Sequence, residues 1–163
     1  MTNRPYSALI IATAKEHGLN PLLVAAVIHQ ESSGRAYAMR KEEAFYQKYI
    51  KPKRTREELQ GHVPAQSLVT LETERGLRAY SFGLMQIMGQ TAREYGFAAD
   101  DIAELLRPEN NIEIGCRILK RHMDTTKDVY FALLRYNGGG DEMYPERVLS
   151  HIDNNQLGYL VEL

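Results

Sequence analysis

Hydrophobic positions in the first third of the chain recur at the spacing of an α-helix. A short helix with one apolar face comes first and is expected to end at Gly18; that face comprises Leu9, Ile10, Thr13 and Ala14. Asn20 followed by Pro21 is a strong helix start, since asparagine caps the free N–H groups and proline suits the first turn. Residues 21–32 are apolar nearly all round in their first two turns, which is typical of a buried helix.

The next part of the chain, residues 35–80, is more polar. Lys41 to Ile50 predicts an amphipathic helix, and its inward residues would be Ala44, Phe45, Tyr49 and Ile50. Residues 55–58 read Thr-Arg-Glu-Glu, which fits a capping box at the start of a short helix. A further helix is expected over residues 67–76.

The second half of the chain again favours helices. Residues 81–88 are short, apolar and bounded by glycines, and they predict a loop or a short strand. Helices are expected at 90–95, 100–106, 107–123, 129–136 and from Pro145 onward. The longest of these carries a core stripe of Ile112, Cys116, Leu119 and Met123. We therefore expect a mainly α fold with little or no β-sheet.

Composition places the chain among ordinary globular proteins and makes some functions improbable. The 163 residues suffice for one domain, and 44% hydrophobic with 25% charged residues argues against disorder. The formal net charge is −1, so no overall positive field favours nucleic acid, and we expect no nucleic-acid partner. A helical nucleic-acid binder using the basic stretch from Lys51 to Arg56 is a remote alternative.

Cysteine content and the apolar runs bear on folding and location. Cys116 is the single cysteine, so no internal disulfide can form, and its apolar helical setting predicts a buried structural thiol. The first apolar run, residues 8–12, is too short for a signal sequence. The run from Leu22 to Ile28 is far shorter than the roughly 20 residues of a membrane helix. We expect synthesis in the cytoplasm, no membrane insertion and a monomer.

The candidate for chemistry is Glu31. It follows Val27 and Ile28 at helical spacing, so a carboxyl group continues an otherwise apolar face. Partial burial and the negative end of the helix dipole would both raise its pKa. A glutamic acid that stays protonated can give a proton to a glycosidic oxygen. The alternative is that Glu31 only marks where the helix leaves the core and meets water.

Other familiar motifs do not occur. The five histidines form no zinc motif, and no serine lies in a nucleophile elbow. Gly138 to Gly140 is followed by Asp141 rather than Lys-Ser or Lys-Thr, so it is not a phosphate loop. We expect no metal and no cofactor.

Four segments decide between the two interpretations of Glu31. They are Ala25-Ala26-Val27-Ile28-His29-Gln30-Glu31-Ser32-Ser33-Gly34, Gly83-Leu84-Met85-Gln86-Ile87-Met88, Arg107-Pro108-Glu109-Asn110-Asn111-Ile112-Glu113-Ile114-Gly115 and Ala132-Leu133-Leu134-Arg135-Tyr136-Asn137-Gly138-Gly139. In this order, over about residues 20–140, they resemble the motifs of soluble lytic transglycosylases. That family shares a lysozyme-like fold with goose-type lysozymes, and the resemblance implies the same fold here.

The resemblance also implies roles. Glu31 matches the general acid/base, and five residues match or stand near positions that line the glycan cleft: Ser81, Gln86, Met88, Tyr136 and Asn137. Tyr136 matches a tyrosine close to the catalytic carboxylate. Ser81 matches least well, because Ala79-Tyr80-Ser81-Phe82 replaces the small residues that usually precede this segment. Met88 would fit core packing equally well.

One departure concerns spacing. The family places its glutamate much closer to the Gly-Leu-Met-Gln segment, so residues 35–80 form an insertion in a single domain of residues 1–163. This insertion resembles those found in phage-encoded members of the family. We therefore expect a phage enzyme, an endolysin or a virion part, which acts on the bacterial cell wall outside the cytoplasm.

Two reactions stay open for one glutamate. In lytic transglycosylases the acid protonates the β-1,4 bond between N-acetylmuramic acid and N-acetylglucosamine, and then removes the proton of the muramyl 6-hydroxyl to close a 1,6-anhydro ring. In a lysozyme-like hydrolase a second carboxylate positions water, and Glu72 and Glu74 are the candidates. The motifs favour the first reaction. A non-catalytic wall-binding virion module is the further alternative.

Overall fold

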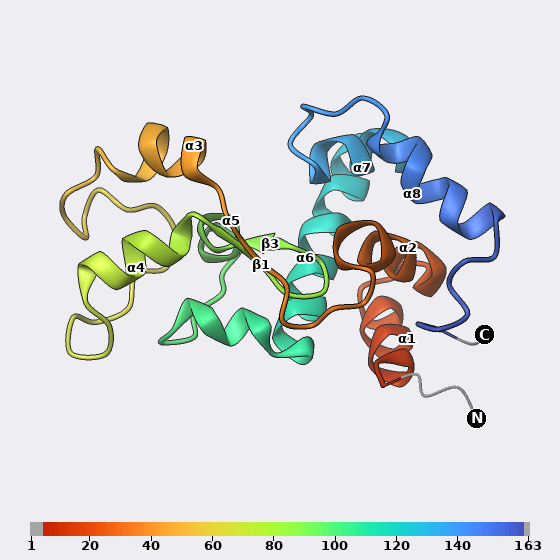
Figure 1. Ribbon diagram of the computed structural model, residues 1–163, viewed down its shortest axis with the longest axis horizontal. Helices are drawn as coiled ribbons and strands as arrows, with labels where there is room; N and C mark the ends of the chain where they lie inside the picture. The colour runs from red at the N-terminus through yellow and green to blue at the C-terminus, as the bar shows by residue number, and fades with distance from the viewer. Residues whose placement is uncertain (1–4, 162–163) are drawn as a thin grey trace. The chain divides into compact units, whose positions relative to one another are not determined.

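The computed structural model describes residues 5–161, which fold mainly into helices with one small sheet (Figure 1). The predicted fold class is therefore confirmed. Contacts divide the chain into two compact units. The first unit contains the residues up to Gly34 and those from Gly115 onward, and the second contains Arg35–Ile114.

The first unit consists of helices. They are α1 (Ser7–Glu16), α2 (Pro21–Ser32), the C-terminal part of α6 (Pro108–Thr126), α7 (Val129–Tyr136) and α8 (Tyr144–Asp153). Helix α2 packs against α1 and α8, and α8 also packs against α7. The six residues from Leu23 to Ile28 are all buried, as their apolar sequence predicts. The Asn20 side chain caps α2 by accepting a hydrogen bond from the Leu22 N–H at 2.9 Å.

Helix α6 has the predicted apolar stripe. Ile112, Cys116 and Leu119 are fully buried, whereas Met123 is half-buried near the end of the helix. Cys116 is buried and forms no disulfide, which confirms the predicted buried setting. This burial results from the helical spacing of three apolar residues on one face.

The second unit contains the antiparallel sheet. Its strands are β1 (Met39–Lys41), β2 (Tyr80–Phe82) and β3 (Ile87–Met88), in the order β1-β2-β3. Ser81 pairs with Arg40 on one side and Met88 on the other. The helices are α3 (Glu43–Phe45), a π-helix η1 (Tyr46–Ile50), α4 (Leu71–Arg78), α5 (Gly89–Glu94) and a 3₁₀-helix η2 (Ile102–Leu106).

Three predictions for the polar middle segment were wrong. The helix expected over Lys41–Ile50 is split into α3 and η1, and of its four inward residues only Ile50 is fully buried. Residues 55–58 form no helix, although Glu58 accepts the hydrogen bond from the Thr55 N–H that a capping box requires. The strand β1 was not expected, because its three residues are all exposed and show no alternating pattern.

No helix among the described residues is both long enough and apolar enough to cross a membrane.

Candidate active site around Glu31

Glu31 lies in the last turn of α2, where the buried part of the helix ends. The six preceding core residues fix the helix, and Glu31 itself is half-buried. The helix stops because Ser33 adopts a left-handed conformation with φ 53° and Gly34 follows with φ 78°. The carboxyl group is therefore held on a rigid helix at the edge of the core.

The nearest partner of Glu31 is Tyr144, the first residue of α8. The Tyr144 hydroxyl donates a hydrogen bond to Oε1 of Glu31 at 2.6 Å. Only 3% of Tyr144 is exposed. Burial raises the pKa of the Tyr144 hydroxyl well above its usual range, and the nearby charges of Glu31 and Tyr136 add to this effect. The hydroxyl therefore stays protonated and serves as a permanent donor.

Tyr136, the last residue of α7, is the second tyrosine beside this carboxyl group. Burial raises the pKa of Tyr136, and the charge of Glu31 raises it further, which shows that the two side chains interact. The chain thus brings one carboxyl group and two phenols together from α2, α7 and α8 within a single compact unit. The carboxyl group of Glu31 can exchange a proton, and the two phenols, which stay protonated, can donate hydrogen bonds.

Sequence reasoning missed Tyr144 although a signal was present. Tyr144, Pro145 and Val148 recur on the buried face of α8. A tyrosine on a core face needs a partner for its hydroxyl, and a carboxyl group at the edge of the same core is a natural acceptor.

Asn137 and the glycines after it end α7. The backbone N–H of Asn137 donates to the Leu133 carbonyl at 3.1 Å, and Gly138 and Gly139 both have positive φ. An added Cβ at either glycine would meet open space. The positive φ values suit glycine at both positions. The role of the Asn137 side chain as a glycan contact stays a prediction.

The other predicted cleft residues belong to the second unit. Gln86 has a left-handed backbone with φ 48°, and its Nε2 donates to the carbonyls of Gly83 at 2.9 Å and Ala38 at 3.2 Å. Met88 is half-buried at the end of β3. Ser81 is 5% exposed and its hydroxyl donates to Glu42 at 3.2 Å, and its role toward a glycan also stays a prediction. The roles of Gln86 and Met88 toward a glycan stay predictions.

Asn111 explains why two of the recognised motifs occur together. Its side chain is fully buried, donates to the carbonyls of Phe82 and Leu105, both at 2.8 Å, and accepts from the Met85 N–H at 2.7 Å. A Cβ at Gly83 would stand 2.5 Å from this amide. The Gly-Leu-Met-Gln turn is therefore anchored to the first turn of α6 by one asparagine.

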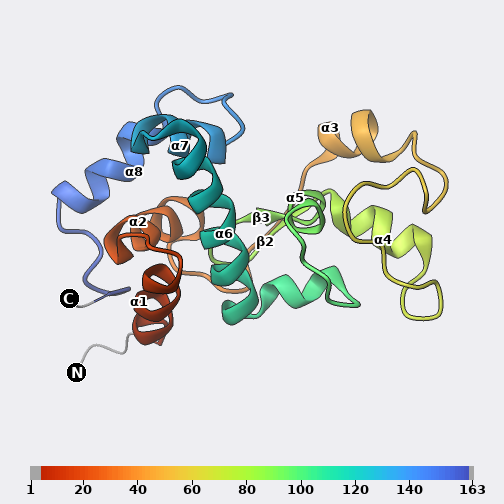
Figure 2. The same ribbon diagram turned by 180° about the vertical axis from the view of Figure 1, so that it is seen from behind.

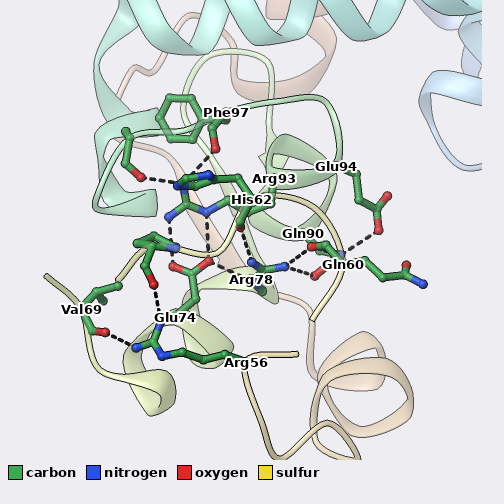
Figure 3. Close-up of polar contacts among 12 residues, drawn as sticks. Arg56, Gln60, His62, Val69, Glu74, Arg78, Gln90, Arg93, Glu94 and Phe97 are labelled. Atoms are coloured by element: carbon green, nitrogen blue, oxygen red, sulfur yellow. Dashed lines mark hydrogen bonds and ion pairs between the residues drawn. The ribbon is translucent and has the colours of Figure 1, made fainter. Parts of the chain in front are cut away.

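The two candidates for a second carboxylate have very different surroundings. Glu72 is exposed and pairs with Arg75 at 3.0 Å. Glu74 is completely buried, and its Oε1 accepts from Nε of both Arg78 and Arg93 at 2.9 Å (Figure 3). Its Oε2 accepts from Arg93 at 3.0 Å. A carboxylate occupied by two guanidinium groups cannot position a water molecule on a glycan, so the expectation for Glu74 was wrong.

Glu74 is instead the centre of a buried ionic cluster. Arg78 donates to the carbonyls of Gln60 and His62, and Arg93 donates to those of Phe97 and Ala99. Figure 3 shows these backbone segments converging on the two guanidinium groups. The cluster gives partners to carbonyls outside the helices and strands, and it ties Gln60, His62, Phe97 and Ala99 to one buried carboxylate.

Within residues 5–161, no group of three His, Cys, Asp or Glu side chains is arranged to hold a metal ion.

Comparisons with known proteins agree with the motifs. Residues 8–147 match the sequence model of the Transglycosylase SLT domain family. A protein of Enterobacteria phage PRD1, described as a transglycosylase, is 27% identical over 150 residues, which are 87% of this chain and 41% of that protein. The chain thus spans less than half the length of this relative. No solved structure gives a significant match.

Proposed function

Because the chain belongs to the Transglycosylase SLT domain family, we propose that it cleaves the glycan strands of peptidoglycan as a lytic transglycosylase. The observation that carries the proposal is the carboxyl group of Glu31 at the edge of the core, next to two phenols that stay protonated. The family match and the phage relative support the choice of substrate and reaction.

The proposed reaction uses one group twice. Glu31 protonates the oxygen of the β-1,4 bond between N-acetylmuramic acid and N-acetylglucosamine, which breaks the bond and leaves an oxocarbenium-like muramyl residue. The resulting carboxylate accepts the proton of the muramyl 6-hydroxyl while that oxygen bonds to the anomeric carbon. A 1,6-anhydro end forms, Glu31 regains its proton, and no water is consumed.

Tyr144 suits the ionised stage of this cycle. A hydrogen bond donated to a carboxylate stabilises the charged form, whereas the burial at the end of α2 favours the neutral form. The hydrogen bond therefore supports the carboxylate that forms after the first proton transfer. In this proposal Tyr144 is a positioning residue and Glu31 the catalytic residue.

Product analysis tests the reaction. Mass spectrometry of peptidoglycan digested by the purified protein should show anhydromuramyl ends. Reducing muramyl ends in their place would establish a hydrolase, for which Glu72 is the remaining carboxylate of the two considered. The variant Glu72→Gln should leave the anhydro product unchanged.

The variant Glu31→Gln tests the catalytic residue. It removes the exchangeable proton but keeps the size of the side chain, so turnover should fall by about 10²–10⁴-fold. Circular dichroism and the melting temperature should stay near those of the original protein. Undiminished lysis by this variant would contradict the role of Glu31. Binding of peptidoglycan without cleavage by the original protein would favour a wall-binding module.

We also infer action on the cell wall during a phage life cycle, as an endolysin or a virion part. The likeness to the protein of phage PRD1 supports this inference. Immunodetection of the protein in purified virions and in lysates would separate the two settings.

A further inference from the structure

A surface groove lies between the end of α6 and α7. It has a volume of about 390 Å³ and is formed by the end of α6 and by α7; its lining residues are Thr125, Thr126, Phe131, Leu134 and Arg135. Lys127, with φ 57°, lies in the turn between these two helices, and Figure 2 shows α6 and α7 as neighbours. We call this feature the α6–α7 groove, and all of it belongs to the unit that carries Glu31.

The α6–α7 groove combines an exposed aromatic ring with positive charge. Phe131 is 57% exposed, which is unusual for a phenylalanine. Burial lowers the pKa of His122, and the charges of Arg135 and Arg121 lower it further. In the described part of the chain, neither guanidinium forms an ion pair with a carboxylate. The groove therefore presents free positive charge beside an apolar surface.

The acidic side chains closest in sequence are already engaged. Asp124 pairs with Lys120 at 2.5 Å, and Oδ1 of Asp128 caps α7 by accepting from the Phe131 N–H at 3.1 Å. These contacts leave Arg121 and Arg135 uncompensated at short range. A ligand for this groove should therefore carry negative charge.

The threonine hydroxyls add a further requirement. Thr125 donates its hydrogen to the Arg121 carbonyl at 2.7 Å, and Thr126 donates to the His122 carbonyl at 2.9 Å. Oγ1 of Thr125 can then only accept, so it suits an N–H donor of a ligand, whereas Oγ1 of Thr126 already accepts from the Asp128 N–H at 3.3 Å. Carboxylates, N–H groups and short apolar side chains occur together in an acidic peptide.

We propose that the α6–α7 groove binds the carboxylate-bearing peptide stem of peptidoglycan while the attached muramyl residue lies at Glu31. This proposal rests on the proposed function, because it takes peptidoglycan as the substrate. It assigns Arg135 to a stem carboxylate and Phe131 to an apolar side chain of the stem.

The lengths are compatible. Arg135 precedes Tyr136, whose side chain interacts with Glu31. Phe131 lies five residues before Tyr136 in the same helix, or about 7.5 Å along its axis. A stem of four extended residues spans about 13 Å. The separation of these residues along the helix axis is therefore within the length of such a stem.

Binding to a catalytically inactive protein tests this proposal apart from the reaction. In the Glu31→Gln background, a synthetic peptide stem with free carboxylates should bind, and the added change Arg135→Gln should weaken binding about tenfold, as expected for a lost charged hydrogen bond. Phe131→Ser should weaken it as well. Lys15→Gln removes an exposed cation of α1 and should have no effect.

Three outcomes would overturn the proposal. They are equal binding with and without Arg135, equal binding of a stem whose carboxylates are amidated, and stronger competition by a glycerol phosphate polymer than by the peptide.

Glycan strands stripped of their stems supply a second readout, based on activity. Arg135→Gln should lower kcat/KM on stem-bearing strands and leave stripped strands unaffected, whereas a loss on both substrates would indicate a structural role. Failure of the proposed reaction would instead appear as inactivity of the unmodified protein on both substrates.

Discussion

At the scale of single residues, the site depends on one hydrogen bond between distant parts of the sequence. Tyr144 is 113 positions away from Glu31, yet its hydroxyl lies 2.6 Å from Oε1. The tyrosine is buried and stays protonated, so this contact persists over the working pH range. A hydrogen bond donated to a carboxyl group favours its ionised form over its neutral form.

The variant Tyr144→Phe should shift the basic limb of the pH–rate profile to higher pH. Removing a donor worth about 1 kcal/mol destabilises the carboxylate and corresponds to roughly 0.7 pH units. The pH dependence of kcat/KM provides the measurement. Tyr130→Phe is a matched control, because the hydroxyl of Tyr130 donates to the Glu142 carbonyl instead. An unchanged profile would separate Tyr144 from the titration of Glu31.

At the scale of elements, α2 and α8 meet through a pair of histidines next to the site. The rings of His29 on α2 and His151 on α8 have centroids 4.3 Å apart. His29 Nδ1 is hydrogen bonded to the Tyr159 hydroxyl at 2.8 Å, and His151 Nε2 to Gln30 at 2.9 Å. Burial lowers the pKa of His29, and the neighbouring His151 lowers it further. The contact therefore favours the neutral form of His29.

This pair predicts a loss of stability in mild acid. The folded protein protonates His29 at lower pH than the unfolded chain does, so its contribution is present above about pH 6.5 and is lost as the pH falls below that value. Urea unfolding at pH 7.5, 6.0 and 5.0 should show this decrease. His29→Gln should make the decrease smaller, whereas His62→Gln, which removes an exposed histidine of the other unit, should not. Parallel curves for all three proteins would refute the assignment.

At the scale of the whole molecule, the two compact units are held by different forces. The first unit has an apolar core around α2, and the second adds the cluster of Glu74, Arg78 and Arg93. A buried ion pair contributes little net stability, but removal of one partner leaves an uncompensated charge. The second unit should therefore be far more sensitive to the loss of a single carboxylate.

Glu74→Gln should lower the free energy of unfolding by about 3–5 kcal/mol. Glu72→Gln removes an exposed carboxylate two positions away and should change it by less than about 1 kcal/mol. Hydrogen exchange should show the protection lost by Glu74→Gln mainly in residues 55–99, with the amides of α2 less affected. A small change for Glu74→Gln would argue against the central role of this cluster.

The sequence by itself determined the helices of the first unit and the catalytic candidate. The apolar run from Leu23 to Ile28, the cap at Asn20 and the Ser33-Gly34 stop define α2, because local spacing and backbone preferences fix a buried helix almost unaided. The stripe of α6 and the bounds of α7 follow in the same way. The resemblance carried by four motifs agrees with the family match.

Only the tertiary structure decided the partners of these residues. Tyr144 reaches Glu31, Asn111 reaches Met85, and Glu74 becomes the core of an ionic cluster through contacts across long stretches of chain. In the polar segment 35–80, local propensity predicted helices that packing replaced with a strand, a π-helix and irregular backbone. The hydrogen-bond partners of buried polar groups depend on which segments of the chain meet in the fold. The periodicity of one segment does not indicate which other segment it will contact.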